Sequence, residues 1–331
     1  MEKGIKERYS DEIRDETLRR YGVSHEDAVL LDGFESYIYE FSNREVNTIL
    51  RVGHSQRRSP ALIAGEVDWI NYLVDGGVSA SRALPSRSGQ LIEEIKDGCG
   101  GNFLATAFHK ADGRHVESGS WNTALMERYG HEIGKMHALS KQYRPLKSAW
   151  TRPQWDDPEM LDIQAWLPVN ERRILMKFQE LKRLLDGLPK NRDSYGLVHQ
   201  DAHAGNLYVD DSGKITFFDF DDCAYSWYVN DIAIVLFYLL LGQEQPASFA
   251  FEFMSNFLRG YRQEMKLNAF WLGQIPNFLK LREIDLYAVI HRSFDLEQLD
   301  DPWVEMYMDG RKKKIEDDIP YVEFDFSSLI E

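Results

Sequence analysis

Cysteine is scarce in this sequence, which has only Cys99 and Cys223 among 331 residues. Two cysteines do not make the framework of several disulfides that holds small secreted domains together, and they do not supply a cysteine-rich zinc module. We therefore expect a protein of a reducing compartment, with the cytoplasm as its location.

Long hydrophobic runs are also missing. The most apolar stretch, IAIVLFYLLL at residues 232–241, is about half as long as a helix that crosses a bilayer, so it predicts a buried helix. The first residues, MEKGIKERYSDEIRDE, are charged from the second position and lack the apolar core of a secretory signal. No membrane partner is expected.

Positive charge is in deficit, because 39 Lys and Arg face 54 Asp and Glu, a formal net charge of −15. A surface this acidic repels nucleic acid and anionic lipid. The basic run 311–314 is followed at once by Asp317 and Asp318, which cancel most of its field. We therefore expect no nucleic-acid partner. The negative charge is expected to serve mainly solubility, and to give at most a mild preference for cationic small molecules. No oligomeric state is predicted.

The length suggests two domains at roughly 100–200 residues each, and the hydrophobic pattern changes near residue 110. Before that point, apolar and polar residues alternate in four segments that predict strands, at 37–41, 47–52, 90–95 and 103–108. One segment between them, 66–73, has the apolar spacing of a helix. After it, helical patterns dominate, at 125–140, 171–186, 230–241, 247–265 and 276–299. The sequence predicts an α+β protein whose domains are a small antiparallel β lobe at 1–108 and a mostly α lobe at 109–331.

Residues 197–222, LVHQDAHAGNLYVDDSGKITFFDFDD, carry the chemistry. A short apolar strand leads into a loop that contains Asp201, and Asn206 follows directly before a predicted hairpin with its turn at 210–213. Folding the hairpin brings Asn206 and Asp219 to its open end, because paired strands lie about 4.8 Å apart. Amide and carboxylate oxygens are ligands that suit Mg2+. Asp201 would then accept a hydroxyl proton from an acceptor near the metal-bound phosphate.

The pattern H-x-D-x-x-x-x-N followed by D-F-x, at residues 199–221, is typical of eukaryotic-type protein kinases and their small-molecule relatives. On these residues the chain resembles the aminoglycoside phosphotransferase/choline kinase superfamily, particularly its homoserine-kinase-type and bacterial stress-response-kinase branches. The resemblance covers about residues 28–300. It implies a bilobal protein-kinase-like fold, ATP as the phosphoryl donor and Mg2+ as the metal.

The resemblance also implies roles for individual residues. Asp201 stands at the catalytic base, and Asn206 and Asp219 stand at the metal ligands. Arg51 stands where the family has a strand residue that contacts the α- and β-phosphates, with Glu66 as its acidic partner. The remaining nucleotide-binding positions are Gly33 and Ser36 in the loop that covers the phosphates, Ile49 beside Arg51, and Ala107, Phe108 and His109 at the adenine hinge. Asp231 matches an aspartate that braces the catalytic loop.

Three residues depart from the family pattern. Arg51 replaces the usual lysine, Gly33 is the single glycine of the phosphate loop, and Asp221 replaces the glycine two positions after Asp219. Arginine keeps the charge but is not equivalent to lysine. Asp221 would either bind a second metal or face solvent beside Asp222.

The acceptor pocket is predicted less closely. Asp221, Asp222, Tyr225 and Trp227 follow the metal-binding motif, and aromatic and acidic side chains attract cationic amines. Aromatics further along the chain, and His137, are expected in the core, and His203 is expected to cap its loop.

We expect a kinase that transfers the γ-phosphoryl group of ATP to a hydroxyl of a small metabolite such as an amino alcohol, homoserine or an aminoglycoside. A protein Ser/Thr kinase of the stress-response type is an alternative, although Asn230 follows Asp219 by only eleven positions and leaves little room for an activation segment. An inactive nucleotide-binding module is the third hypothesis, suggested by Arg51 and the sparse glycine loop.

Overall fold

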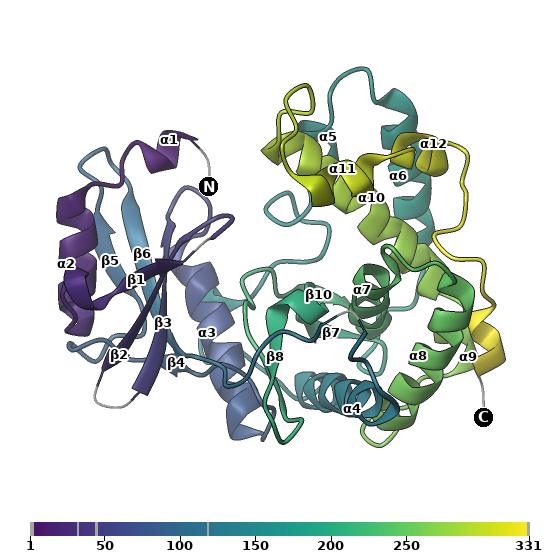
Figure 1. The fold of residues 1–331 in the computed structure, drawn as a ribbon, viewed down its shortest axis with the longest axis horizontal. Helices are drawn as coiled ribbons and strands as arrows, with labels where there is room; N and C mark the ends of the chain where they lie inside the picture. The colour runs from purple at the N-terminus through teal and green to yellow at the C-terminus, as the bar shows by residue number, and fades with distance from the viewer. Residues whose placement is uncertain (1–2, 32, 44–45, 118, 330–331) are drawn as a thin grey trace. The chain divides into compact units, whose positions relative to one another are not determined.

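The computed structural model describes residues 3–31, 33–43, 46–117 and 119–329, and the chain forms two compact units (Figure 1). The first unit comprises Met1–Gly113, Tyr143–Arg152 and Thr216–Asp221. The second comprises Arg114–Gln142, Pro153–Ile215 and Asp222–Glu331.

The first unit is built on a six-stranded antiparallel sheet of order β1-β2-β3-β6-β4, with β5 also paired to β6. Its strands are β1 (Val29–Leu31), β2 (Tyr37–Asn43), β3 (Val46–His54), β4 (Ala83–Leu84), β5 (Glu93–Lys96) and β6 (Asn102–His109). The alternating runs 37–41 and 47–52 also predict a hairpin with a turn at 42–44, and β2 and β3 form an antiparallel pair with Tyr39 opposite Leu50. Residue 44 of the predicted turn lies outside the described residues.

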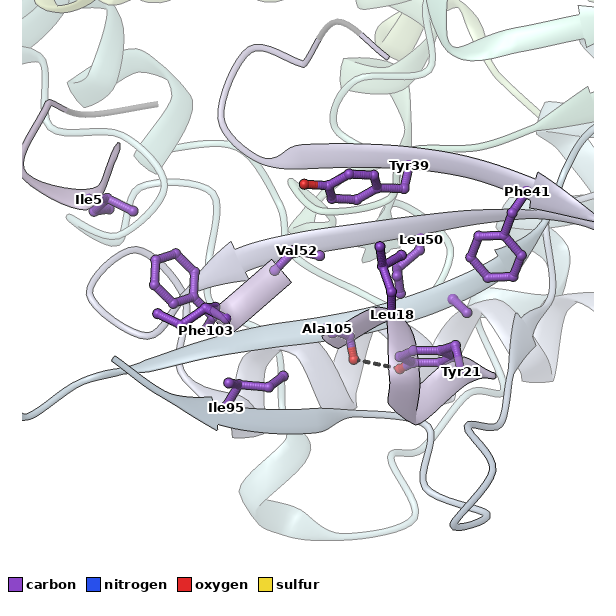
Figure 2. Close-up of a cluster of buried hydrophobic side chains, with 12 residues drawn as sticks. Ile5, Leu18, Tyr21, Tyr39, Phe41, Leu50, Val52, Ile95, Phe103 and Ala105 are labelled. Atoms are coloured by element: carbon purple, nitrogen blue, oxygen red, sulfur yellow. Dashed lines mark hydrogen bonds between the residues drawn. The ribbon is translucent and has the colours of Figure 1, made fainter. Parts of the chain in front are cut away.

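Two helices that the sequence reading did not predict precede the sheet, α1 (Lys3–Lys6) and α2 (Asp11–Tyr21), and a short 3-10 turn, His25–Asp27, follows them. Ser10 caps α2 by accepting from the Ile13 amide, and Gly22 ends it in the left-handed conformation that glycine tolerates. Figure 2 shows the buried cluster beneath α2, in which the Tyr21 hydroxyl donates to the Ala105 carbonyl at 2.8 Å. The sheet residues of this cluster include Tyr39, Phe41, Leu50, Val52, Phe103 and Ala105.

Helix α3 (Pro60–Asp75) is the helix predicted between the strands. Ser59 caps it, Pro60 occupies its first turn, and its buried face carries Trp69, Ile70 and Leu73. Because successive side chains of a strand point to opposite faces, Arg51 of β3 lies on the face opposite Leu50, where α3 offers its own side chains.

The second unit is mostly helical, as predicted. Its helices are α4 (Thr123–Ser140), α5 (Ile163–Trp166), α6 (Arg172–Asp186), α7 (Tyr228–Leu240), α8 (Pro246–Tyr261), α9 (Ala269–Leu272), α10 (Ile275–Ser293), α11 (Pro302–Met308) and α12 (Arg311–Glu316). The apolar helix predicted at 230–241 is α7, and all but one of its residues are buried. Helix α10 stops at Ser293, earlier than predicted, because Phe294 is extended and Asp295 accepts from the Glu297 amide in a turn.

Two short strand pairs complete the fold. Strand β7 (Tyr195–Val198) pairs antiparallel with β10 (Ala224–Trp227), and β8 (Leu207–Val209) pairs with β9 (Ile215–Phe217). The predicted turn between β8 and β9 is confirmed: Asp210 accepts from the Ser212 and Lys214 amides, and Gly213 has a φ of 78°. Among the described residues, no helix has both the length and the apolar character needed to span a bilayer.

Candidate active site

The loop after β7 is fixed by a buried carboxylate in the first turn of α7. Asp231 Oδ2 accepts from the His199 amide at 2.9 Å and Oδ1 from the Gln200 amide at 2.7 Å, and His137 Nε2 lies 3.1 Å from Oδ2. Asp231 and His137 are both fully buried. The structure therefore contains the brace that the sequence predicted, and His137 belongs to the core as expected.

Backbone strain marks the same loop. Gln200 has a φ of 69°, a left-handed conformation that is costly for a residue with a side chain. Its amide is held by Asp231, and its side-chain oxygen accepts from Asn230 Nδ2 at 2.8 Å. These bonds hold the chain in the strained turn that leads directly to Asp201.

Asp201 and Asn206 contact each other across the loop. Asn206 Nδ2 donates to Asp201 Oδ2 at 2.8 Å and to the Asp201 carbonyl at 3.0 Å. With its amide nitrogen used in this way, Asn206 presents its oxygen Oδ1 as the atom that suits a hard cation. His203 accepts from the Gly205 amide through Nδ1 at 2.9 Å, so it caps the loop as predicted.

An arginine that the sequence reading missed also holds Asp201. Arg282 on α10 donates from Nη2 to Asp201 Oδ1 at 2.5 Å and from Nη1 to Asp285 Oδ2 at 2.8 Å. Burial raises the pKa of Asp201, but contacts with His203 and the positive charge of Arg282 outweigh burial and hold that pKa below its ordinary value. Asp201 is therefore an ionised carboxylate.

In the first unit, Arg51 and Glu66 form a bidentate ion pair, with Nη1–Oε1 at 2.9 Å and Nη2–Oε2 at 2.6 Å. Glu66 is fully buried, and the guanidinium carbon of Arg51 lies 5.3 Å from the centre of the Phe108 ring. Asp219 Oδ1 is 3.7 Å from Arg51 Nη1, and Asp219 has a φ of 60°. The structure thus brings four predicted site residues together in this unit.

Strand pairing places the other predicted nucleotide-binding residues near Arg51. Ile49 is paired with Phe108, and Ala107 and His109 flank Phe108 on β6. Gly33 sits in the loop before β2, where a Cβ atom would lie 2.3 Å from the Ser36 carbonyl oxygen. The single glycine is therefore required for the tight turn of this loop.

Asp221 is buried within a cluster of arginines. Arg57 Nη1 donates to its carboxylate, Arg58 Nε lies 3.4 Å and Arg51 Nη1 3.8 Å away, and Arg152 Nη2 donates to its carbonyl at 2.7 Å. Burial raises the pKa of Asp221, and the surrounding arginines more than reverse the effect and lower it. The solvent-facing alternative is wrong, and the surrounding arginines disfavour a second metal.

Two of the three departures from the family pattern, Arg51 and Asp221, belong to one ion network. Arg57 pairs with Asp221 and also with Glu35, which lies two positions after Gly33 in the phosphate loop. Arg51 contacts Asp221 as well. The carboxylate of Asp221, which stands in place of the family's glycine, is therefore a counter-charge for the arginines around it.

Of the two aromatic residues predicted for the acceptor pocket, Trp227 lies in the core and Tyr225 is partly exposed. Trp227 is fully buried, packs against Trp155 and Phe278, and donates to the Pro189 carbonyl at 3.2 Å, so its assignment to the pocket is wrong and it belongs to the core. Trp271 and Tyr287 are buried as predicted, and Tyr225 is half-buried on β10.

Asp222 lies in the same electrostatic environment as two carboxylates of the second unit. Burial raises the pKa of Asp285, Arg282 lowers it, and the negative charges of Asp222 and Asp201 raise it further. No motif marks Asp285 or Arg282, because both reach the site through the packing of α10. Within the described residues, no group of three or more His, Cys, Asp or Glu side chains is placed to hold a metal.

Comparison with known proteins identifies the family. A sequence model of the "Phosphotransferase enzyme family" matches residues 28–267. The chain is 38% identical over 335 aligned residues to amicoumacin kinase of Bacillus subtilis (strain 168), and the alignment covers 100% of this chain and 99% of that protein.

Solved structures agree with this family and confirm the predicted α+β, protein-kinase-like fold. Amicoumacin kinase in complex with AMP-PNP, Ca2+ and Ami matches with a TM-score of 0.93 at 38% identity, over 100% of both chains. A microcompartment-associated aminopropanol kinase shares the fold, with a TM-score of 0.74 at 24% identity over 93% of this chain and 97% of that one. The chain belongs to the phosphotransferase enzyme family and is a small-molecule kinase.

Proposed function

We propose that this kinase uses ATP and Mg2+ to phosphorylate a hydroxyl group of a small amine-bearing molecule, with an amicoumacin-type antibiotic as the first candidate acceptor. The observation that carries the proposal is the arrangement of Asp201: a strained, braced loop presents an ionised carboxylate beside an asparagine whose amide oxygen is available to a cation. The 38% identity to amicoumacin kinase over the full chain supports the choice of acceptor.

Nucleotide binding is assigned to the first unit. Arg51, oriented by the bidentate contact with Glu66, would neutralise the non-reacting phosphates of ATP. Residues 107–109 would offer backbone groups to the adenine from β6, and the loop with Gly33 and Ser36 would cover the phosphates. Because arginine binds phosphate oxygens with two nitrogens, it replaces the usual lysine with a different geometry.

Metal binding is assigned to Asn206 and Asp219, whose oxygen atoms fit a hard divalent cation. When bound, Mg2+ neutralises charge on the transferring phosphate. Asp201 orients the acceptor hydroxyl and takes its proton. Phosphoryl transfer has a loose transition state, so the proton leaves late and a weak base of low pKa is sufficient.

The amine is assigned to the carboxylates around Arg282. Asp201, Asp222 and Asp285 outnumber the one guanidinium among them, and the pKa of Asp285 is raised first by burial and then by the negative charges of Asp222 and Asp201. An ammonium group placed here would relieve this repulsion. A protein substrate is disfavoured, because β10 and the start of α7 occupy the chain directly after the D-F-D motif and leave no extended activation segment.

The test is an ATP-consumption screen with amicoumacin, aminoglycosides, aminopropanol, choline, homoserine and a generic protein substrate. We expect turnover with an amine-bearing small molecule, and a loss of about 100- to 10,000-fold in kcat for Asp201→Asn. Phosphorylation of the protein substrate alone would support the stress-response alternative instead. Near-normal turnover of Asp201→Asn would refute the assigned base.

A further inference from the structure

Arg282 lies on α10, beyond the residues 28–267 that the family model matches. Its guanidinium is in direct contact with three side chains of the second unit. Nη2 donates to Asp201 Oδ1 at 2.5 Å and to the Tyr238 hydroxyl at 2.7 Å, and Nη1 donates to Asp285 Oδ2 at 2.8 Å. The Arg282 side chain is only 15% exposed.

These contacts hold the Asp201 carboxylate from the side opposite Asn206. Asn206 Nδ2 donates to Oδ2, and Arg282 Nη2 donates to Oδ1. A carboxylate held at one oxygen rotates about its side-chain bonds, whereas one held at both oxygens has a fixed plane. The guanidinium is a rigid planar fork, so it transmits its own orientation to the group that it binds.

Arg282 is itself held in place from several directions. Asp285 binds its Nη1, and the Tyr238 ring lies beneath it, with the guanidinium carbon 5.3 Å from the ring centre. The His203 ring packs on Tyr238 at 4.3 Å between ring centres. The position of Arg282 is therefore defined by α10, α7 and the catalytic loop together.

Stability alone does not account for this arginine. Burying a charged cluster costs desolvation, and a well-packed hydrophobic residue in its place is often neutral or stabilising. In the part of the chain that the structure describes, Arg282 Nε is in addition a buried donor with no hydrogen-bond partner. The Arg282 side chain thus donates a hydrogen bond to Asp201 while its own Nε remains without an acceptor.

We propose that Arg282 is a positioning residue for phosphoryl transfer, which acts by fixing the Asp201 carboxylate in the orientation that receives the acceptor hydroxyl. Asp285 supports it by holding the far side of the guanidinium. This inference rests on the proposed role of Asp201, and it names a residue outside the motifs of the family as part of the site.

The test compares Arg282→Gln, Arg282→Lys and Arg282→Ala in the full chain, with Arg259→Gln as the control, since Arg259 is 58% exposed on α8. The probe is Mg-ATP with amicoumacin as acceptor, or Mg-ATP hydrolysis to water where amicoumacin is not phosphorylated. We expect Arg282→Gln to lose about 100-fold in kcat, the effect of a misplaced catalytic group, while AMP-PNP affinity stays within the range of the control. Its melting temperature should fall, because Asp201 and Asp285 lose the counter-charge between them. Activities are therefore compared at a temperature at which circular dichroism shows every variant to be folded.

Two further readouts separate positioning from a structural role. Millimolar ethylguanidinium should restore part of the activity of Arg282→Ala, and Arg282→Lys should retain more activity than Arg282→Gln. In an Asp201→Asn background, Arg282→Gln should cost nothing more, because the group on which it acts is gone.

The inference is overturned if Arg282→Gln keeps full kcat, or if its loss persists undiminished in the Asp201→Asn background, which would mean a direct contact with substrate. It is also overturned if ethylguanidinium fails to rescue Arg282→Ala at a temperature at which that variant is folded. Wild-type kcat in Asp201→Asn alone would instead show that the proposed base is wrong.

Discussion

At the scale of single residues, the negative charge of Asp221 offsets the positive charges of several arginines in the first unit. Arg57, Arg58 and Arg51 all lie within ion-pair distance of its carboxylate, and Arg152 donates to its carbonyl. A glycine at this position, as in the usual motif, would leave these guanidinium groups without their shared counter-charge.

We predict that Asp221→Gly destabilises the protein by about 3–5 kcal/mol, the cost of breaking a buried ion pair by removing one partner. Urea unfolding followed by circular dichroism measures the change. Asp211→Gly, at an exposed turn position, is the control. Equal stability of Asp221→Gly and the control would show that the arginines do not depend on Asp221.

Asp97 connects stability to pH. Burial raises its pKa, but Arg8, the amides of Cys99 and Gly101, and His54 outweigh burial and lower it below the ordinary value of 3.8. A lowered pKa stabilises the fold above the pKa of the unfolded chain, and this contribution is lost as the pH falls through the lower folded pKa.

The stability advantage of the wild type over Asp97→Asn should therefore be constant near neutral pH and should shrink below about pH 4. Thermal melting of both proteins over a pH series checks the prediction. Asp75→Asn, whose side chain is 71% exposed, is the control and should show no such trend. An advantage that grows as the pH falls would contradict the assigned ion pair.

At the scale of elements, helices α4 and α8 approach so closely that they require glycine at the contact. A Cβ atom on Gly130 would lie 1.8 Å from the Phe257 carbonyl oxygen, and one on Gly260 would lie 1.8 Å from the Glu127 carbonyl oxygen. Both atoms are backbone, so neither helix relieves the clash by moving a side chain.

Gly130→Ala should destabilise the second unit by about 1 kcal/mol, the difference between an overpacking cost of about 2 kcal/mol and a gain of about 1 kcal/mol from better helix propensity. Gly119→Ala, where a Cβ atom has nothing within 4 Å, should be neutral. Chemical denaturation of both variants measures the difference. A stabilised Gly130→Ala would mean that the helices separate without cost.

The elements that the sequence predicts are those with a strong local signal. Helix α7 is apolar throughout and β2–β3 alternates, and both are found where predicted. Helix α2 is not among the predicted elements, although Ser10 and Gly22 supply ordinary cap signals, because most of its residues are charged and its apolar face is narrow. Strand β5 begins at Glu93, later than predicted, since its pairing with β6 starts there.

The residues of the candidate site also differ in how strongly the local sequence marks them. Asp201, Asn206 and Asp219 are predictable because a single short segment carries them at fixed spacing. The contact of Arg51 with Glu66 is also predictable, because the two residues lie on a strand and on the helix that follows it in the chain. Arg282 and Asp285 were not predictable, because the packing of α10 brings them to Asp201 from about eighty positions away, with no spacing rule to mark them.

At the scale of the whole molecule, the net charge of −15 acts on any charged acceptor before it binds. A cation is attracted by an acidic protein over a distance set by the Debye length, which falls from about 30 Å at 0.01 M to about 8 Å at 0.15 M ionic strength. This long-range attraction adds to the local carboxylates near Asp285.

We therefore predict that kcat/KM for an amine-bearing acceptor falls as sodium chloride rises from low to physiological concentration. Asp285→Asn should lower kcat/KM at every salt concentration and leave most of the salt dependence in place. Steady-state kinetics at several ionic strengths tests both statements. An acceptor rate that rises with salt would exclude a cationic substrate.

Helix α2 sets a practical limit on how this protein is divided for experiments. The match of the family model begins at residue 28, after the helix has ended. A shortened chain that starts there would expose apolar side chains of the sheet, among them Leu50, Val52 and Phe103, because the side chains of α2 that pack with them would be missing. Expression fragments, and fusions that replace the N-terminus, need to keep the segment from Ser10 to Gly22.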